Sequence, residues 1–354
     1  MPATVTLTLT PKQAADFELC TTLAARQMGI RRSDVALARV VKRSIDARRR
    51  PVKVNISIEI FADNEPQPAP LHFDYPDVSH ATEVIVVGSG PAGLFAALHL
   101  IECGLKPIIL ERGKRVLPRK QDIALINRNL DIDPDSNYAF GEGGAGTFSD
   151  GKLFTRSKKR GDYNKALQTL VFHGATPEIL YDAHPHIGTD RLPRIISNIC
   201  RTIVTAGGEI HFGAKVTGFK IEGGRIRGVW VGDTLVEGAA VVLATGHSAK
   251  DVYYTLHRDG VRLEAKPFAM GVRIEHRQAG VDAAQYRALA GHPALPPSTY
   301  KLSCHLPNGR SAFSFCAVFP AGFFFSVPEA CAALGLRISP SVGFAEGIFK
   351  ASIF

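Results

Sequence analysis

Apolar and polar positions alternate at the start of the chain in a way that predicts secondary structure directly. Residues 4–10, TVTLTLT, have a period of two, which predicts a half-buried strand. Residues 12–28 have helical spacing, and Pro11 suits the first turn of that helix. Two further strands are predicted over 35–41 and 52–61. The order β-α-β-β predicts a small α+β domain of ferredoxin-like character over residues 1–62.

The pattern changes in the middle of the chain. Residues 63–81 are rich in proline and acidic residues and have no period, so they predict a linker or an irregular crossover. From residue 83, an apolar strand, a glycine turn, an apolar helix (91–103) and a second apolar strand follow one another. Such continuous apolar runs are typical of a parallel sheet buried on both faces. Between 190 and 260 a helix precedes several short strands, so the fold class expected is α/β with a Rossmann-like domain.

The glycine turn after the first apolar strand has the spacing GxGxxG. Gly88 allows a tight exit from the strand, Gly90 lets the backbone approach a pyrophosphate, and Gly93 lets the helix pack closely on the sheet. Glu111 follows 18 residues after Gly93 and is placed to bind a ribose. The residues expected to bind the dinucleotide here are Gly88, Gly90, Pro91, Ala92, Gly93, Glu111, Arg112 and Arg119.

The turn alone does not distinguish FAD from NAD. The apolar strand that ends in Thr245 and Gly246, within VVLATGHSA, is the second element of many FAD-binding folds. Val216, in a neighbouring strand, would then lie against the adenine. Together these residues favour FAD as the tightly held cofactor.

Charge and cysteine content restrict the other classes of function. The net charge of +9 is concentrated in residues 31–53 and 152–160, which predicts either solvated basic faces or an anionic partner such as a cofactor phosphate, an acidic protein or RNA. The six cysteines form no CxxC pair, which argues against a metal site and against a redox-active dithiol. Without a signal peptide or an apolar run of about 20 residues, the expected location is the cytoplasm, with no membrane partner.

Several motifs together resemble a known family. GSGPAGLFAAL, ILERG, NYAFGEGGAGTFSDGKLFTR, PHIGTDRL, LATGHSAKDV, KPFAMGVRIEH and SFC stand in the order found in poorly characterised bacterial FAD-dependent dehydrogenases of the glutathione-reductase superfamily. The resemblance covers residues 1–316. It implies an FAD-dependent oxidoreductase that transfers a hydride through flavin N5, and it names no substrate.

The resemblance also gives a role to the second glycine cluster, GEGGAG. It too has GxGxxG spacing, but a polar loop precedes it rather than a buried strand, so it fails as a second Rossmann turn. By resemblance it belongs to the same FAD site, where its amides would favour negative charge. A glycine loop without a ligand is the alternative. The residues implied are Gly143, Gly144, Gly146 and Thr147.

The candidate catalytic residues are Lys152, His186 and Arg273. Lys152 follows the second glycine cluster, where it either lies near the pyrimidine end of the flavin and stabilises the reduced anion or is an exposed surface lysine. His186 can act as an acid or base near neutral pH. His247 is a further acid–base candidate or an orienting group. Arg273 would form a positive face for an anionic small-molecule substrate, or a salt-bridged strand. Because no second strand–GxGxxG–helix unit is present, NAD(P)H is expected only as a transient reductant.

These observations predict five segments: a ferredoxin-like domain (1–62), a linker (63–81), an FAD-binding domain (82–260, with inserted loops at 131–190), the start of an incomplete substrate domain (261–316), and an atypical tail (317–354). The tail departs from the family pattern, which suggests a frameshift or premature end. Two alternative functions stay open at this point: an FAD-containing RNA-modifying or RNA-binding protein, and a non-catalytic flavin-binding fragment.

Overall fold

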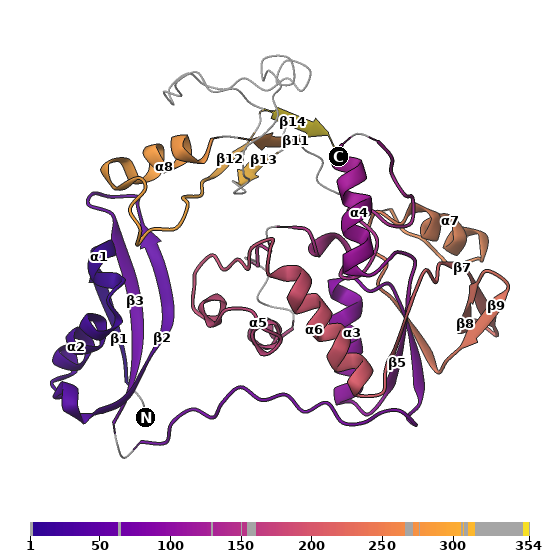
Figure 1. Cartoon of the computed structure of the whole chain (residues 1–354), viewed down its shortest axis with the longest axis horizontal. Helices are drawn as coiled ribbons and strands as arrows, with labels where there is room; N and C mark the ends of the chain where they lie inside the picture. Colours follow the sequence, from indigo (N-terminus) through magenta and orange to yellow (C-terminus); the bar gives the residue numbers. More distant parts are fainter. Residues whose placement is uncertain are drawn as a thin grey trace. The chain divides into compact units, whose positions relative to one another are not determined.

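The computed structural model describes residues 3–62, 65–128, 130–149, 151–153, 161–265, 272–275, 277–305, 307, 311–315 and 350–353. The chain divides into two compact units (Figure 1). The first unit comprises Met1–Pro68, Tyr181–Ala183 and Lys266–Phe354, and the second comprises Ala69–Leu180 and His184–Ala265. Among the described residues, no helix is long and apolar enough to cross a bilayer.

The first unit begins with the antiparallel sheet that the alternating pattern predicts. Its strands are β1 (Ala3–Leu9), β2 (Val35–Asp46) and β3 (Lys53–Ala62), in the order β1-β3-β2. Alternate residues of β1 and β3 enter a core against the helices, so Ile56, Ile58 and Ile60 are buried. The α+β organisation is therefore confirmed for these elements, and the finer ferredoxin-like assignment stays a prediction.

The single helix predicted over 12–28 is wrong, because two helices occupy this stretch. They are α1 (Pro11–Ala14) and α2 (Phe17–Met28). Asp16 lies between them in an extended conformation, and its carboxylate accepts a hydrogen bond from the Leu19 N–H at 3.0 Å. This is an N-cap, so Asp16 starts a new helix instead of continuing the first. An acidic residue within a helical pattern was the signal for this break.

The first unit also contains elements from later in the chain. They are β11 (Val272–Glu275), α8 (Gln278–Tyr286), η4 (Arg287–Leu289), β12 (Lys301–His305), β13 (Ser311–Phe315) and β14 (Lys350–Ile353), whereas the short helix η1 (Arg32–Asp34) lies between α2 and β2. β12 pairs with β13, and β11 pairs with β14, both antiparallel. The strand predicted around Arg273 is therefore present as β11. Residues 316–349, most of the atypical tail, lie outside the described residues.

The second unit contains the predicted parallel sheet. Its order is β10 (Ala240–Leu243), β4 (Glu83–Val87), β5 (Lys106–Glu111) and β6 (Glu209–Phe212). Both faces are covered, as the apolar runs predict, because successive residues of β4 enter different cores. Val86 packs in a cluster with residues of α3 (Pro91–Glu102) and α6 (Leu192–Thr205). Ile85 and Val87 pack in a second cluster on the opposite face.

The second cluster is covered by an antiparallel sheet and one helix. These elements are β7 (Val216–Glu222), β8 (Arg225–Val231), β9 (Thr234–Glu237) and α7 (Lys250–Arg258). The remaining elements of this unit are α4 (Val116–Asn127), η2 (Gly144–Gly146), α5 (Tyr163–Phe172) and η3 (Pro177–Leu180). Figure 1 shows α3 and α6 side by side, with α4 following β5.

The segment before β4 is irregular, as its composition predicts, but part of it is built into the second unit. Val78 is only 2% exposed and belongs to the core, and its N–H donates to the Ala206 carbonyl at 2.8 Å. The rings of Phe73 and Tyr75 stack and both contact Phe172. Residues 73–78 are therefore packed structure, which favours the irregular crossover over the linker, the two alternatives predicted for residues 63–81.

Candidate functional site

The packing of the chain itself requires glycine at two positions in the turn between β4 and α3. Gly88 has a φ of +103°, and a Cβ on it would lie 2.6 Å from the Ala244 carbonyl oxygen. A Cβ on Gly93 would lie 1.9 Å from the Gly88 carbonyl oxygen. Both distances are far below van der Waals contact, so no side chain fits at either position. These are the tight exit and the close helix packing predicted from the motif.

Gly90 differs from its two neighbours in the motif. Its φ is −67°, which any residue can adopt, and the nearest heavy atom to a Cβ placed there is the Gly144 Cα at 3.9 Å. Neither the backbone conformation nor internal packing therefore requires glycine at this position. Gly90 is the N-cap of α3, it supplies no side-chain cap, and with Pro91 and Ala92 it lines a pocket. The positive end of the α3 dipole thus lies at this pocket.

The second glycine cluster meets the first at the same place. The Gly143 N–H donates to the Ser89 carbonyl at 2.9 Å, and a Cβ on Gly144 would lie 2.9 Å from the Gly90 Cα. Gly144 lines the same pocket as Gly90. No strand precedes this cluster in the described residues 130–143. The two GxGxxG motifs therefore meet at one pocket, and their assignment to a single FAD site stays a prediction.

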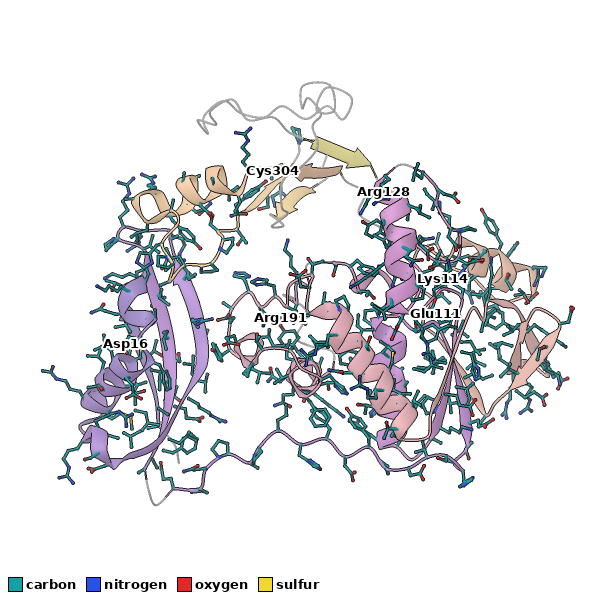
Figure 2. All side chains as sticks on the ribbon, viewed as in Figure 1. Asp16, Glu111, Lys114, Arg128, Arg191 and Cys304 are labelled. Atoms are coloured by element: carbon teal, nitrogen blue, oxygen red, sulfur yellow. The ribbon has the colours of Figure 1, made fainter. Side chains whose placement is uncertain are left out.

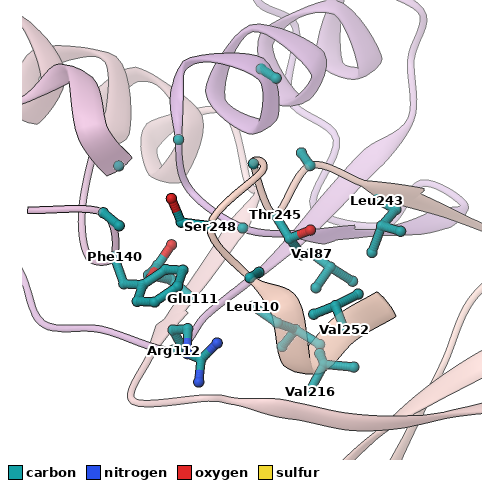
Figure 3. A pocket seen from close by; sticks show the side chains of 18 of the residues that line it. Val87, Leu110, Glu111, Arg112, Phe140, Val216, Leu243, Thr245, Ser248 and Val252 are labelled. Atoms are coloured by element: carbon teal, nitrogen blue, oxygen red, sulfur yellow. The ribbon is translucent and has the colours of Figure 1, made fainter. Parts of the chain in front are cut away.

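The pocket has a volume of about 350 Å³ and lies at the carboxyl ends of β4, β5 and β10 (Figure 3). This end of a parallel sheet is where ligands of such folds bind. Apolar side chains make most of its wall beyond the glycine turns. Of the predicted site residues, those that line it are Gly88, Gly90, Pro91, Ala92, Glu111, Arg112, Gly144, Val216, Thr245 and Gly246.

Five other predicted residues do not line the pocket but lie behind it. Gly93 is in α3, at its close contact with the Gly88 carbonyl. Gly146 lies against the Pro91 ring. A Cβ on Gly143 would meet Thr147 and Ile196. Thr147 is fully buried, and its hydroxyl donates to the Glu142 carbonyl. The fifth residue, Arg119, has the most extensive contacts of this group.

Arg119 is completely buried beneath the second glycine cluster. Its guanidinium donates to the carbonyls of Asn137, Tyr138, Glu142 and Gly144 at 2.8–3.2 Å, and to the Thr147 hydroxyl at 3.2 Å. Burial lowers the pKa of Arg119 to about 10, so it stays charged at neutral pH. Its N–H groups are committed to the loop. The structure therefore gives Arg119 the role of shaping the loop from its buried side, which differs from the phosphate contact expected from the sequence.

Glu111 joins three segments of the site. It is 4% exposed, and its Oε2 accepts hydrogen bonds from the Ser89 N–H and hydroxyl, both at 2.8 Å. Its Oε1 accepts from the N–H groups of Gly113 at 2.9 Å and Gly141 at 3.0 Å. The carboxylate thus links the first glycine turn to the second glycine cluster. These four donors come from the chain itself, and the predicted bond of Glu111 to a ribose stays a prediction.

Charged side chains form the rim of the pocket near β7. Arg112 bonds to Asp135 and Asp251, and its guanidinium lies 4.4 Å from the centre of the Phe140 ring. Lys215, which also lines the pocket, lies 3.1 Å from Asp135. Figure 3 shows Arg112 and Phe140 next to each other at the pocket wall. The two cations are matched by two carboxylates, so this rim is close to neutral.

Two of the three candidate catalytic residues are brought together by the fold. Lys152 and His186 are opposite each other in an isolated antiparallel bridge, flanked by the bonds Leu153 N–H to Pro185 O and Ile187 N–H to Gly151 O. This pattern is the non-hydrogen-bonded kind of pair, in which opposing side chains are closest. Both side chains are exposed. The side chain of Arg273 lies outside the described residues, although its backbone is in β11.

Several residues of the site were not predicted. Ser89, Phe140, Lys215 and Ser248 take part in the pocket or its hydrogen bonds, and His247, weighed only as an alternative, also lines it. Buried Glu142 accepts a bond from the Val116 N–H at 2.7 Å and so caps α4. A small polar residue between the two glycines of the first turn was a usable signal for Ser89, whereas the others depend on long-range packing.

The basic stretch 31–53 has many carboxylate partners. Arg31 pairs with Asp34, Arg32 with Glu18, Arg39 with Glu59, Arg43 with Asp182 and Arg48 with Asp46. These pairs lower the net positive charge that the phosphates of RNA would meet. Residues 154–160 of the second basic stretch lie outside the described residues. Within the described residues, the alternative of RNA binding therefore gains no support.

Two segments of the chain match family models of FAD-binding or FAD-dependent proteins. A family model described as an FAD binding domain matches residues 83–117. A second, described as "FAD-dependent protein, C-terminal domain-like", matches residues 267–327, and a domain of unknown function matches residues 1–61. The C-terminal match continues past Cys316, where the resemblance was expected to end. Residues 83–117 are thus similar to FAD-binding domains, and this stretch contains the first glycine turn and Glu111.

One relative and two solved structures extend this comparison. An uncharacterized protein of Clostridium beijerinckii is 36% identical over 308 residues, which cover 82% of this chain and 58% of the relative. The chain therefore spans less than two thirds of that relative's length. THI4 of Thermovibrio ammonificans is 22% identical, over 51% of this chain and 62% of that chain, with a TM-score of 0.32. Glycine oxidase from Bacillus cereus is 15% identical, over 49% and 58%, also with a TM-score of 0.32.

Proposed function

We propose that this chain is an FAD-dependent oxidoreductase whose cofactor binds in the pocket between the two glycine clusters. The observation that carries the proposal is the open position at Gly90. The chain's own packing explains Gly88 and Gly93 but gives no reason for glycine at 90, where a side chain would project into free space beside the pocket. A ligand that approaches the backbone closely explains the glycine at this third position.

The residues around Gly90 fit the pyrophosphate of a dinucleotide. α3 begins at Pro91, so its first N–H groups and the positive end of its dipole lie where Gly90, Pro91 and Ala92 line the pocket. Gly144 adds a second backbone segment from the other glycine cluster. Two glycine segments and a helix N-terminus together suit a doubly negative phosphate group better than side-chain cations would, because backbone amides can approach it most closely.

The wall farther from α3 fits a flat heteroaromatic ring. Val216, Leu243 and Val252 give it apolar surface, and Phe140 with Arg112 adds a ring and a planar guanidinium. Such groups stack on aromatic faces. This combination supports a nucleotide with its adenine near β7 and its phosphates at α3.

Bound FAD would supply two-electron redox chemistry, which no amino-acid side chain provides. The chain would contribute the groups that bind substrate and handle its protons. In our proposal, the ammonium of Lys152 attracts an anionic substrate, and His186 beside it holds or accepts a proton. Their cross-strand pairing supports a shared role, because two exposed side chains on one bridge can reach the same small molecule.

The cofactor assignment is tested by FAD titration of the purified chain. We expect a flavin absorbance spectrum after reconstitution, and we expect Gly90→Val to lose FAD affinity at least about 100-fold while keeping its fold, because the branched side chain fills the space left for the phosphates. A control needs the same change at a glycine away from the pocket, such as Gly280 in α8. Valine is unsuitable there, because β-branched residues disfavour helices. Gly90→Ala and Gly280→Ala are the matched pair, since an added Cβ meets nothing within 3.5 Å at either position.

Gly90→Ala should weaken FAD binding, and Gly280→Ala should leave it unchanged. A chain that takes up no FAD, or a Gly90→Val variant that binds FAD as tightly as the unmodified chain, would remove the basis of the proposal.

The oxidoreductase assignment needs a separate readout. Under anaerobic conditions, NADH or NADPH should bleach the flavin spectrum of the reconstituted chain. Lys152→Gln and His186→Gln should keep the flavin spectrum but slow bleaching or substrate turnover at least about 10-fold. Bound FAD that neither nicotinamide reduces, and that a chemical reductant does reduce, would instead favour the non-catalytic flavin-binding fragment.

A further inference from the structure

A cluster of a thiol, an imidazole and a carboxylate lies at the C-terminal end of α3, at the opposite end of this helix from the pocket. It consists of His99, Glu102 and Cys103. Residues three and four positions apart lie on the same face of a helix, so these side chains are neighbours. None of them lines the pocket described above.

The three side chains form a hydrogen-bonded series. The Cys103 Sγ lies 3.9 Å from the His99 Nε2, and the His99 Nδ1 lies 3.0 Å from the Glu102 Oε2. The Lys165 Nζ, from α5, binds the same Glu102 oxygen at 2.5 Å. Glu102 is the least exposed member, with a side chain 19% exposed, whereas that of His99 is 69% exposed. Cys103 is exposed and unpaired by any disulfide.

The carboxylate fixes the direction of the imidazole. Burial alone would raise the pKa of Glu102, but the hydrogen bonds from His99 and Lys165 outweigh it and lower the pKa, so the side chain is an anion at neutral pH. An anion at this position requires His99 to donate through Nδ1–H. In the neutral imidazole, Nε2 then carries the lone pair and points toward the thiol. A nucleophile beside a base that a third group orients is the arrangement of activated nucleophiles.

We propose that Cys103 is a reactive thiol that undergoes exchange with small-molecule disulfides, with His99 as its base. The Cys103 proton passes to His99 Nε2, and the Cys103 sulfur attacks one sulfur of the disulfide. A new S–S bond to Cys103 forms as the disulfide's own S–S bond breaks. The leaving thiolate takes the proton back from His99, so one disulfide yields one mixed disulfide and one free thiol.

The position of Cys103 makes the role of His99 testable. Cys103 is the C-cap of α3, so it is far from the positive helix end beside which activated cysteines often lie. Without a base, this thiol should therefore react no faster than an ordinary exposed cysteine. Fast reaction at Cys103 then requires His99.

The chain provides an internal reference, because Cys304 in β12 is also an exposed thiol (labelled in Figure 2). Cys20 and Cys200 are buried. The full chain is treated with dipyridyl disulfide at neutral pH, the release of the coloured thione is followed with time, and mass spectrometry of quenched samples assigns the modified cysteine. We expect Cys103 to react at least about 10-fold faster than Cys304.

Two variants test the mechanism. His99→Gln should slow Cys103 to the rate of Cys304 or below, and Glu102→Gln should cause a smaller loss, with Cys304 unchanged in both. His257→Gln removes an exposed imidazole from the last turn of α7, so it is the matched control and should change neither rate. Equal rates for Cys103 and Cys304 in the unmodified chain, or a fast Cys103 that persists in a folded His99→Gln variant, would overturn the proposal.

Discussion

Glu111→Gln is the sharpest test of how the site is built, because it changes one charge and almost no volume. The carboxylate accepts four hydrogen bonds, two from Ser89 and one each from Gly113 and Gly141. A glutamine retains one accepting oxygen and replaces the other with an NH₂ group. That group faces donors whichever way the amide is turned.

The two orientations of the amide differ in cost. With its NH₂ group toward Gly113 and Gly141, two buried backbone N–H groups lose their acceptor. With its NH₂ group toward Ser89, the hydroxyl can rotate to accept from it and donate to the Gly141 carbonyl, 3.5 Å away, so only the Ser89 N–H is orphaned. One orphaned buried donor costs about 1–3 kcal/mol, and each remaining bond loses about 1 kcal/mol when its acceptor becomes neutral. The second orientation is therefore favoured. It costs about 1–3 kcal/mol for the Ser89 N–H and about 2 kcal/mol for the bonds from Gly113 and Gly141, a total of about 3–5 kcal/mol.

The assay uses the one tryptophan of the chain, Trp230 in β8, so its fluorescence reports unfolding of the second unit alone. Urea unfolding of Glu111→Gln should show a free energy of unfolding lower by about 3–5 kcal/mol at an unchanged slope. Glu178→Gln makes the same chemical change at an exposed residue of η3 and should stay within about 0.5 kcal/mol of the unmodified chain. If the two variants are equally stable, Glu111 does not hold the glycine segments together.

Three further changes test the packing around the site with the same Trp230 signal. Gly93→Ala should destabilise the second unit by about 3 kcal/mol or more, because its Cβ would lie 1.9 Å from the Gly88 carbonyl oxygen and α3 must shift; unchanged stability would contradict this packing. Arg119→Met should cost about 3–5 kcal/mol, because buried carbonyls of the second glycine cluster lose their donors; a loss below about 1 kcal/mol would refute that role. Burial lowers the pKa of His173 below its usual 6.5, against a smaller opposing effect of the Thr169 carbonyl, so the folded state disfavours the protonated ring. Stability should therefore be full above pH 6.5 and fall as the pH drops from there to the lowered folded-state pKa, and His173→Asn should flatten this dependence.

The fold was predictable where one physical requirement controlled the pattern. The apolar run at β4 and the alternation in β1 each follow from which faces are buried, and both strands lie where the pattern places them. The break at Asp16 was missed because helical spacing continues across it, while the N-cap bond to the Leu19 N–H depends on a single side chain. Val78 was assigned to a linker because its neighbours are proline and acidic residues, and its burial depends on a partner at Ala206, far away in the sequence.

The site residues also divide into those predictable from local requirements and those that depend on distant parts of the chain. Gly88 and Gly93 were predicted because their reasons are local: a turn and a close helix contact. Arg119 was assigned to the phosphates because a sequence shows a charge but not the direction of its side chain. Its true partners are carbonyls of residues 137–144, which reach it only after the second glycine cluster folds back over α4. Lys152 and His186 were singled out separately, and only the bridge between their segments shows that they are neighbours.

These contacts also explain why one cofactor site would need two glycine clusters. A pyrophosphate bound at a helix N-terminus leaves part of its surface open to water unless a second backbone segment covers it, and only glycine lets that segment come close. Gly144 lies against Gly90 at such a distance that a Cβ would overlap it. The second cluster cannot hold this position by apolar packing, because it has almost no side chains. Buried polar groups hold it instead: Glu111 accepts from Gly141 on one side, and Arg119 donates to Gly144 on the other. On this reasoning, the two buried charges are required by the absence of side chains in the loop, and FAD binding should fail in Arg119→Met even if Gly90 and all other residues lining the pocket are intact.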